Sequence, residues 1–183
     1  MNNVFEKAIF LKVVELKLVS ELMKNSRRSD RELAKVLGVS QPTVTRIRTR
    51  LEKEGIIKEY TMIPDFSKLG FSIMSIALAK LKESISEQEL KEVRKQVRQT
   101  LQMEPIPTIL AMSGMGLGAD RVIIAFHEDY SAYSAYFNRL KQHPLVRVEE
   151  IKRFLIDLTD KSQYLPLTFS DLAEYYRRKL QDK

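Results

Sequence analysis

The sequence contains no cysteine and no tryptophan, and its 183 residues include only two histidines, His127 and His143. Without cysteine the chain can form no disulfide, no thiolate nucleophile and no cysteine-based zinc or iron–sulfur site. The two histidines have no near neighbour at a metal-ligand spacing, so we expect no metal site and no cofactor. We expect each histidine to lie at the surface or in a loop.

Long apolar runs are also missing. No stretch approaches the roughly 20 residues that a membrane-spanning helix needs. The first seven residues, MNNVFEK, lack the charged-then-apolar order of a secretory signal. Hydrophobic residues make up 44% and charged residues 30% of the chain, which is typical of globular proteins. We therefore expect a soluble, cytoplasmic protein with no membrane partner.

Positive charge is concentrated in one part of the chain. The formal net charge is +7, from 31 basic and 24 acidic side chains. Eight basic but only three acidic side chains fall within residues 26–53. Such a segment favours an anionic partner such as nucleic acid, although a solvated basic surface would have the same composition.

The basic segment predicts two short helices joined by a tight turn. Ser29 and Glu32 have the spacing of a capping box, which opens a helix that Gly38 ends. Ser40 can cap a second helix, which we expect to continue to Glu54. Two helices joined in this way form a helix-turn-helix, although an ordinary three-helix bundle with a basic face would share the pattern.

The flanking segments complete a small domain. Residues 1–25 have the composition of helix, with a break expected near Val14. Residues 56–63 alternate polar with apolar side chains, which predicts a strand that would serve as a wing. Residues 64–70 have the composition of a linker.

The second helix of a helix-turn-helix enters the major groove with its N-terminal half. With about 100° of rotation per residue, Val44, Ile47 and Leu51 fall on one face, which we expect to be buried. Arginine can pair with guanine, glutamine with adenine, and a threonine methyl can touch thymine. The predicted base contacts are Thr45, Arg46 and Thr49 on the opposite face and Gln41 towards its edge.

Other basic side chains of this region suit the DNA backbone. Phosphate contacts add affinity without reading sequence. The predicted phosphate contacts are Arg27, Arg28, Arg48, Arg50 and Lys53, with Lys58 on the wing.

The second half of the chain predicts the order β-α-β-β-α-β, which is the ferredoxin-like split pattern. The expected strands cover residues 73–81, 108–112 and 122–126, and a last strand carries Val146, Val148, Phe154, Ile156 and Leu158, with an interruption near Glu150. The expected helices carry the stripes Leu90, Val93, Val97, Leu101 and Tyr133, Tyr136, Phe137, Leu140, the first opened by a capping box over residues 86–89. The first strand alternates large side chains with the smaller Ser75, Ala77 and Ala79, which predicts burial on both faces. A short amphipathic helix is expected near the C-terminus.

Several of these motifs match a known family in type and order. They are residues 25–34, residues 37–40, Val44, Arg46, Ile47, Leu51, Glu52, residues 54–57, the linker at 64–70 and residues 143–146. Together they resemble the Lrp/AsnC (feast/famine) family of transcriptional regulators, over about residues 14–160. The match is tight in the first domain and looser in the second.

The resemblance implies an α+β protein of two domains. An N-terminal winged helix-turn-helix with a helical extension would span residues 1–63, followed by a linker at 64–71. A ferredoxin-like βαββαβ effector domain would span 72–160 and a helical tail 161–183. Family members pair their effector domains sheet to sheet into dimers, often build larger discs, and bind small molecules such as amino acids between these domains. The resemblance thus implies a sequence-specific regulator of two-fold DNA operators, not an enzyme.

The glycine-rich segment at residues 113–120 does not fit a nucleotide-binding loop, because it leads into a strand and lacks a Gly-Lys-Ser/Thr motif. We expect a hairpin turn there. The resemblance implies a further role, since family members carry a Gly…Asp motif in this turn near the effector pocket. Gly116 or Gly118 would match the glycine and Asp120 the aspartate, with backbone N–H groups receiving a carboxylate and Asp120 an ammonium. The turn departs from the family pattern in its extra length and in Ala119, where an aromatic residue is usual.

Two other functions share this architecture. Certain haem-pathway decarboxylases have the same two-domain build but act on a tetrapyrrole, which would require a cavity with basic and histidine side chains in the second half. A DNA-architectural protein that has lost effector sensing would bind DNA and respond to no small molecule. The small-residue face at Ser75, Ala77 and Ala79 would suit close packing of two sheets or an ordinary core.

Overall fold

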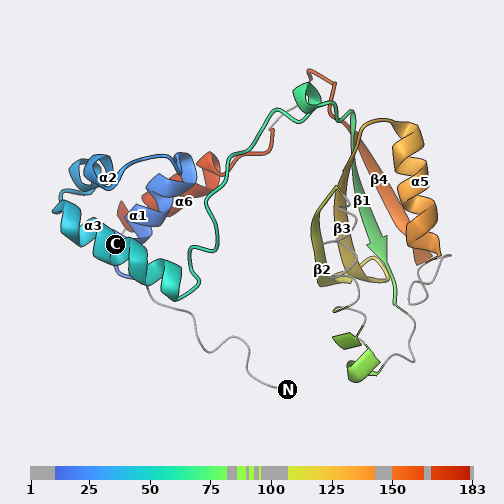
Figure 1. Cartoon of the computed structure of the whole chain (residues 1–183), viewed down its shortest axis with the longest axis horizontal. Coiled ribbons are helices and arrows are strands. Elements are labelled where there is room, and N and C mark those ends of the chain that lie inside the picture. The colour runs from blue at the N-terminus through green and yellow to red at the C-terminus, as the bar shows by residue number, and fades with distance from the viewer. Residues whose placement is uncertain are drawn as a thin grey trace. The chain divides into compact units, whose positions relative to one another are not determined.

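The computed structural model describes residues 11–81, 86–89, 91, 92, 95, 107–142, 150–162 and 166–181. The chain forms two compact units, the first of residues 1–63 and 164–183 and the second of residues 64–163 (Figure 1). Four predictions lie outside the described residues: the helical segment before residue 11, the stripe from Leu90 to Leu101, the position of His143, and the start of the last strand at Val146 and Val148. Within the described ranges, no helix is both long and apolar enough to cross a bilayer.

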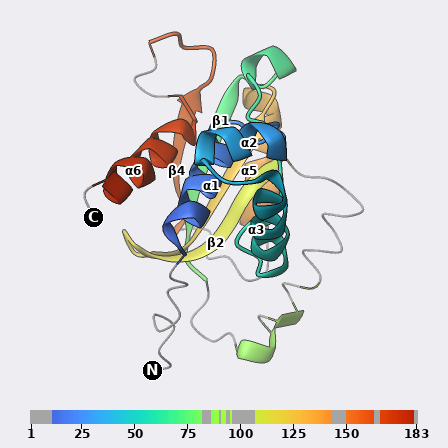
Figure 2. The same cartoon turned by 90° about the vertical axis from the view of Figure 1, so that its left-hand side faces the viewer.

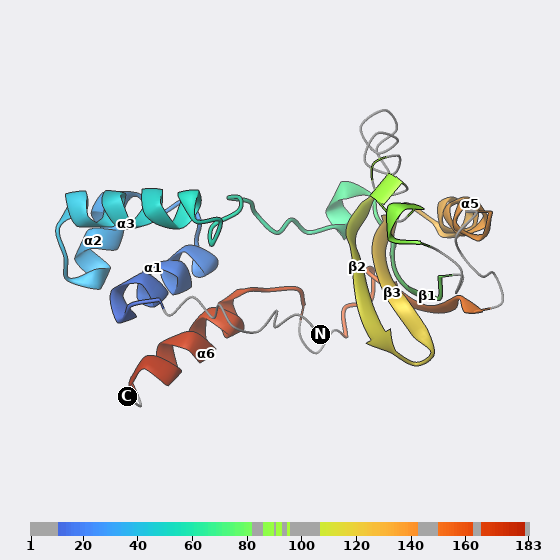
Figure 3. The same ribbon diagram turned by 90° about the horizontal axis from the view of Figure 1, so that it is seen from below.

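Four helices build the first unit. They are α1 (Val13–Lys24), α2 (Asp30–Leu37), α3 (Gln41–Lys53) and α6 (Ser170–Gln181). α1 lies between α3 and α6 in two perpendicular views, and α6 packs along α1 (Figures 2 and 3). The C-terminal helix is therefore part of the same unit as the predicted helix-turn-helix.

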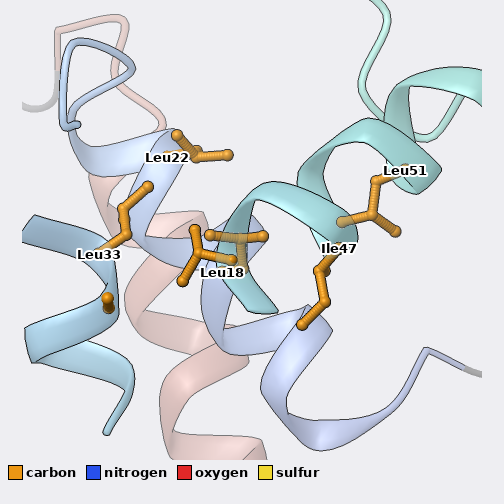
Figure 4. Packing of buried hydrophobic residues seen from close by; sticks show 7 residues of the cluster. Leu18, Leu22, Leu33, Ile47 and Leu51 are labelled. Atoms are coloured by element: carbon orange, nitrogen blue, oxygen red, sulfur yellow. The ribbon is translucent and has the colours of Figure 1, made fainter. Parts of the chain in front are cut away.

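The core of this unit lies between α1, α2 and α3. Its side chains point toward one another from the three helices (Figure 4). The buried apolar residues are Leu18, Leu22, Leu33, Ala34, Val44, Ile47 and Leu51. The predicted inner face of α3 is thus confirmed. Burying a leucine or isoleucine side chain contributes about 1.5–3 kcal/mol, so this cluster fixes the orientation of α3 about its axis.

The predicted helix boundaries of the helix-turn-helix are confirmed to within one residue. The Ser29 hydroxyl accepts from the Glu32 N–H, and a Glu32 carboxylate oxygen accepts from the Ser29 N–H at 2.7 Å. Gly38 ends α2 in the left-handed conformation, with φ of 68°. The Ser40 hydroxyl caps α3 by accepting from the Thr43 N–H.

The strand predicted at residues 56–63 is wrong. The segment has no strand assignment and no strand partner among the described residues. It is held by side chains instead: the Ser26 hydroxyl donates to the Thr61 carbonyl at 3.0 Å, and the Tyr60 hydroxyl donates to Glu52 at 2.7 Å. An alternating pattern produces a strand only where another backbone is available for pairing.

The C-terminal helix is confirmed, and it covers apolar surface of α1. Ala173 is fully buried, and the Ser20 hydroxyl donates to its carbonyl at 2.8 Å. Lys24 and Glu174 form an ion pair at 3.7 Å beside this contact. The inner face of the C-terminal helix is thus used in packing against α1.

The second unit is a four-stranded antiparallel sheet in the order β2-β3-β1-β4, with a helix on one face. Its elements are the 3₁₀ helix η1 (Ser67–Leu69), β1 (Ile73–Ala79), β2 (Thr108–Gly116), β3 (Ala119–His127), α5 (Tyr130–Lys141) and β4 (Lys152–Asp157). This is the strand order of the predicted ferredoxin-like fold. The capping box at Ser86 is also present, since Glu89 accepts from the Ser86 N–H at 2.7 Å.

One face of the sheet is buried beneath α5. Ser75, Ala77 and Ala79 lie on this face and are buried, so the small-residue face belongs to an ordinary core. The surface or loop position expected for His127 is wrong. His127 is 2% exposed, shares a 2.7 Å hydrogen bond with the Ser75 hydroxyl, and contacts the rings of two α5 tyrosines. A strand-end histidine is buried here because α5 crosses above it.

The opposite face of the sheet carries the larger apolar side chains. Residues paired across antiparallel strands lie on the same face, so Ile76, Ile124 and Phe154 are neighbours. Phe66 from the predicted linker stacks on Phe126 at 4.0 Å between ring centroids and covers part of this face. Phe154 remains 64% exposed, which leaves an apolar surface on this side of the described sheet.

Candidate nucleic-acid interface

The outer face of α3 presents polar side chains on a fixed scaffold. Gln41, Arg46 and Thr49 are exposed, opposite the buried face of the helix. None of these three side chains has a hydrogen-bond or ion-pair partner within the described part of the chain. All three are thus available to an external ligand.

Thr45, the fourth predicted base contact, is also exposed, but its hydroxyl is engaged. It donates to an Asp30 carboxylate oxygen at 2.6 Å and approaches the Gln41 carbonyl at 3.2 Å. Because the hydroxyl proton of Thr45 is donated to Asp30, its side chain can offer DNA only its methyl group and the lone pairs of its oxygen. This favours contact with a thymine methyl over donation to a base.

Arg48 lies inside the motif. Its guanidinium pairs with Asp30 at 3.0 Å, donates to the Arg28 carbonyl at 3.1 Å, and lies 5.7 Å from the Tyr60 ring centroid. Burial, together with the hydrogen bond to Glu52, raises the pKa of Tyr60 to about 12, so this phenol stays protonated. Arg48, which the sequence predicted to contact a phosphate, thus connects α2, α3 and the segment that follows α3.

Two more arginines that were predicted to contact phosphates form ion pairs with residues of α1. Arg50 pairs with the buried Glu15 and lies 3.6 Å from Glu54, and Arg28 pairs with Glu21. A buried carboxylate requires such a partner, because an unpaired charge is costly to bury. These arginines therefore serve the packing of α1 in the free protein.

The basic side chains that remain free lie around α3. Arg27, Lys53 and Lys58 are exposed and have no ion pair to any described residue. The sequence did not indicate the roles of Asp30 and Glu15, because their partners lie 15 to 35 residues away. Local patterns contain no signal for such contacts.

The predicted effector turn is a tight hairpin. β2 runs to Gly116 and β3 starts at Ala119, so the expected hairpin turn is confirmed, but it consists of two residues and lacks the extra length expected from residues 113–120. Leu117 and Gly118 have φ of 52° and 76°, the left-handed values of a two-residue hairpin turn. The Lys152 ammonium donates to the Leu117 carbonyl.

Asp120 follows this turn and is half-buried. One carboxylate oxygen accepts from the Leu81 N–H at 3.2 Å and lies 3.6 Å from the Arg121 guanidinium. The structure thus brings Gly116, Gly118 and Asp120 into one hairpin. The Asp120 side chain also fixes the end of β1.

One cavity of the second unit lies elsewhere and has two aspartates in its lining. It measures about 500 Å³, and its lining includes Ser72, Asp129, Tyr130, Asp157 and Thr159 but no basic or histidine side chain. In the described ranges no group of three His, Asp or Glu residues could hold a metal ion. This cavity does not suit a tetrapyrrole, whose carboxylates require basic partners.

Comparison with known proteins assigns this geometry to a family. Residues 13–58 match the family described as winged helix-turn-helix DNA-binding. The chain is 41% identical over 71 residues to the HTH-type transcriptional regulator LrpC of Bacillus subtilis, covering 39% of this chain and 49% of LrpC. The solved structure of B. subtilis LrpC matches with a TM-score of 0.64 and 25% identity, covering 85% of this chain and 99% of that one. In its helix-turn-helix and in its fold, the chain is similar to transcriptional regulators of the Lrp/AsnC family.

Two further transcriptional regulators match over more of the chain. The HTH-type transcriptional regulator Ptr1 of Methanocaldococcus jannaschii is 28% identical over 148 residues, covering 81% of this chain and 93% of Ptr1. A transcriptional regulator of Neisseria meningitidis, NMB0573, solved as a complex with L-Met, has the same fold, with a TM-score of 0.66 at 17% identity over 88% of this chain and 99% of that one. The match spans about half the length of several other curated relatives. The family and fold inferred from the sequence are thus confirmed.

Proposed function

We propose that the chain is a cytoplasmic transcriptional regulator that binds double-stranded DNA sequence-specifically through α3. The observation that carries this proposal is the outer face of α3, where Gln41, Arg46 and Thr49 are exposed and free on a helix whose other side is locked into the core. In this role α3 enters the major groove. Thr45 contributes a methyl contact, and Arg27, Lys53 and Lys58 reach phosphates.

A two-fold operator requires two copies of α3, and the apolar face of the sheet supports a dimer. This face exposes Phe154 beside Ile76, so pairing two copies sheet to sheet would remove a contiguous apolar surface from water. Such a dimer would contain two copies of α3, one for each half-site of the operator. Larger homo-oligomers can then form from such dimers.

An amino acid is the proposed effector, bound near the hairpin that holds Gly116, Gly118 and Asp120. NMB0573 was solved with L-Met, which supports an amino-acid ligand for a protein of this fold. The Asp120 oxygen that does not accept from Leu81 has no hydrogen-bond partner among the described residues and could receive an ammonium group. Effector binding at a subunit interface would change the spacing of the two α3 helices and so the operator affinity.

The two alternatives differ from this proposal in their requirements. The relatives reported above are transcriptional regulators, and the acidic cavity of the second unit does not suit a tetrapyrrole, so the decarboxylase is disfavoured. The architectural protein differs only in effector response. Selection of bound genomic fragments with and without a pool of amino acids separates the two, because only a regulator changes its occupancy.

Replacing Arg46 with alanine tests base reading. We expect Arg46→Ala to weaken operator binding about 10- to 100-fold, since one bidentate base contact contributes about 1–3 kcal/mol, and to weaken random-sequence binding much less. The measurement is titration of both DNAs at several salt concentrations, where wild-type affinity should fall steeply with salt. Arg139→Ala, an exposed arginine on α5, is the matched control. Equal losses on both DNAs would argue against base reading.

Replacing Phe154 with glutamate tests the dimer. Phe154→Glu places a charge in the apolar face, so sedimentation velocity should show a shift toward monomer and operator affinity should fall. Val36→Glu changes an apolar residue of similar exposure on α2 and should leave the assembly unchanged. An unchanged sedimentation coefficient for Phe154→Glu would exclude this face as the dimer contact.

A further inference from the structure

The helix α6 has one face buried and one face free. Its inner face carries Ala173, which packs against Ser20 of α1. Figures 2 and 3 both show α6 on the side of α1 away from α3. The outer face of α6 therefore stays accessible when α3 is in a DNA groove.

The outer face of α6 combines apolar and charged side chains. Leu172 is 46% and Tyr175 is 57% exposed. Asp171, Arg178 and Lys179 fall on the same side, because residues three or four apart are neighbours on a helix. Just before the helix, Phe169 is also exposed and extends the apolar area.

The charges of this face are complementary to those of a second copy in the reverse direction. Asp171 lies four residues before Tyr175 and Lys179 lies four residues after it. In an antiparallel pair centred on Tyr175, Asp171 of each helix faces Lys179 of the other, so the same ion pair forms twice. In a parallel pair, like charges would face one another. Neither Asp171 nor Lys179 has an ion-pair partner among the described residues, and the Lys179 ammonium lies 6.0 Å from the centroid of the Tyr175 ring on the same face.

We propose that the outer face of α6 is a self-association surface that binds the same face of a second copy, antiparallel, with Tyr175 at the two-fold axis. Leu172 packs along the stem of Arg178 on either side of the axis. This contact joins DNA-binding units and uses none of the sheet face. It therefore builds assemblies larger than the sheet dimer and does not depend on DNA binding.

A charge-reversal series tests the proposal on the full-length chain. Asp171→Lys and Lys179→Asp each turn both ion pairs into repulsions, and we expect each to weaken self-association about tenfold at low salt. An equimolar mixture of the two variants restores both pairs, so it should assemble like the wild type. The readout is weight-average mass by sedimentation equilibrium, with thermal unfolding as the check on folding. Single variants that assemble like the wild type, or a mixture as weak as its components, would overturn the proposal.

A cysteine cross-link provides a second measurement that does not depend on charge. The chain has no cysteine, so Tyr175→Cys introduces a single thiol at the proposed axis. Mild oxidation should yield a disulfide-linked dimer, because the two thiols would lie face to face. Lys17→Cys, at an exposed position of α1, is the control and should give only a background of linked dimer. Equal yields from the two variants would reject the antiparallel pair.

Discussion

Asp30 determines what two residues of α3 can do. It accepts from the Thr45 hydroxyl and pairs with Arg48, which also donates to the Arg28 carbonyl. The Asp30 carboxylate thus fixes one side chain of the proposed DNA face and holds a second away from it. Asp30 is a positioning residue, because it acts through Thr45 and Arg48.

Replacing Asp30 with alanine should destabilise the first unit and weaken operator binding. The Asp30–Arg48 pair is less than a third exposed, and leaving one buried partner unsatisfied costs about 1–3 kcal/mol. Urea unfolding and operator titration measure the two effects. Lys68→Ala removes an exposed ion pair with Asp65 and should change the unfolding free energy by less than about 0.5 kcal/mol. No difference between the two variants would contradict the role given to Asp30.

His127 should make the stability of the second unit depend on pH. Burial lowers the pKa of His127 below the ordinary value of 6.5. At a pH between the pKa of His127 in the unfolded chain and its lower pKa in the folded protein, the unfolded chain binds more protons. The contribution of His127 to stability is therefore complete above pH 6.5 and is lost as the pH falls toward the folded pKa. We expect a slope of at most about 1.4 kcal/mol per pH unit. His127→Gln should remove this slope in urea unfolding from pH 7 to 5, whereas His143→Gln should retain it. The reverse pattern would show that His127 does not titrate.

At the scale of elements, short-range signals predicted the helices and the strands of the second unit and failed for the strand at residues 56–63. The caps at Ser29 and Ser40 and the stop at Gly38 act over three or four residues, so the bounds of α2 and α3 could be predicted. The strand at 56–63 could not be judged locally, because strand pairing depends on a distant backbone. The hairpin turn expected at residues 113–120 is present but shorter, because Gly114 and Gly116 extend β2 at the edge of the described sheet.

The turn between α2 and α3 depends on the left-handed conformation of Gly38. A Cβ at this position would meet no atom within 4 Å, so a substitution carries only the conformational cost. Gly38→Ala should lower the unfolding free energy of the first unit by about 1–2 kcal/mol. Gly114→Ala also has open space and needs no left-handed backbone, so its effect should be smaller. If the two variants unfold alike, the turn does not depend on Gly38.

At the scale of the whole molecule, the sequence predicted the two architectures and not the way distant segments meet. Ser20 and Ala173 are 153 residues apart, and no local pattern predicts that the tail joins the helix-turn-helix unit. The same limit applies to the site. Wheel geometry predicted the exposed face of α3, but the internal partners of Arg28, Arg48 and Arg50 come from α1 and α2. The ion-pair partners of these arginines could not be predicted, because the density of positive charge in a segment indicates affinity for anions but not which residues pair.

The central claim is that the outer face of α3 lies in the major groove of an operator. Because the chain has no cysteine, Thr49→Cys can carry a single iron chelate that cleaves nearby DNA. We predict strand cleavage centred on the major groove of each half-site, and none above background from the same chelate at Arg178→Cys on α6. Cleavage that is uniform along the DNA, or stronger from the α6 position, would contradict the account.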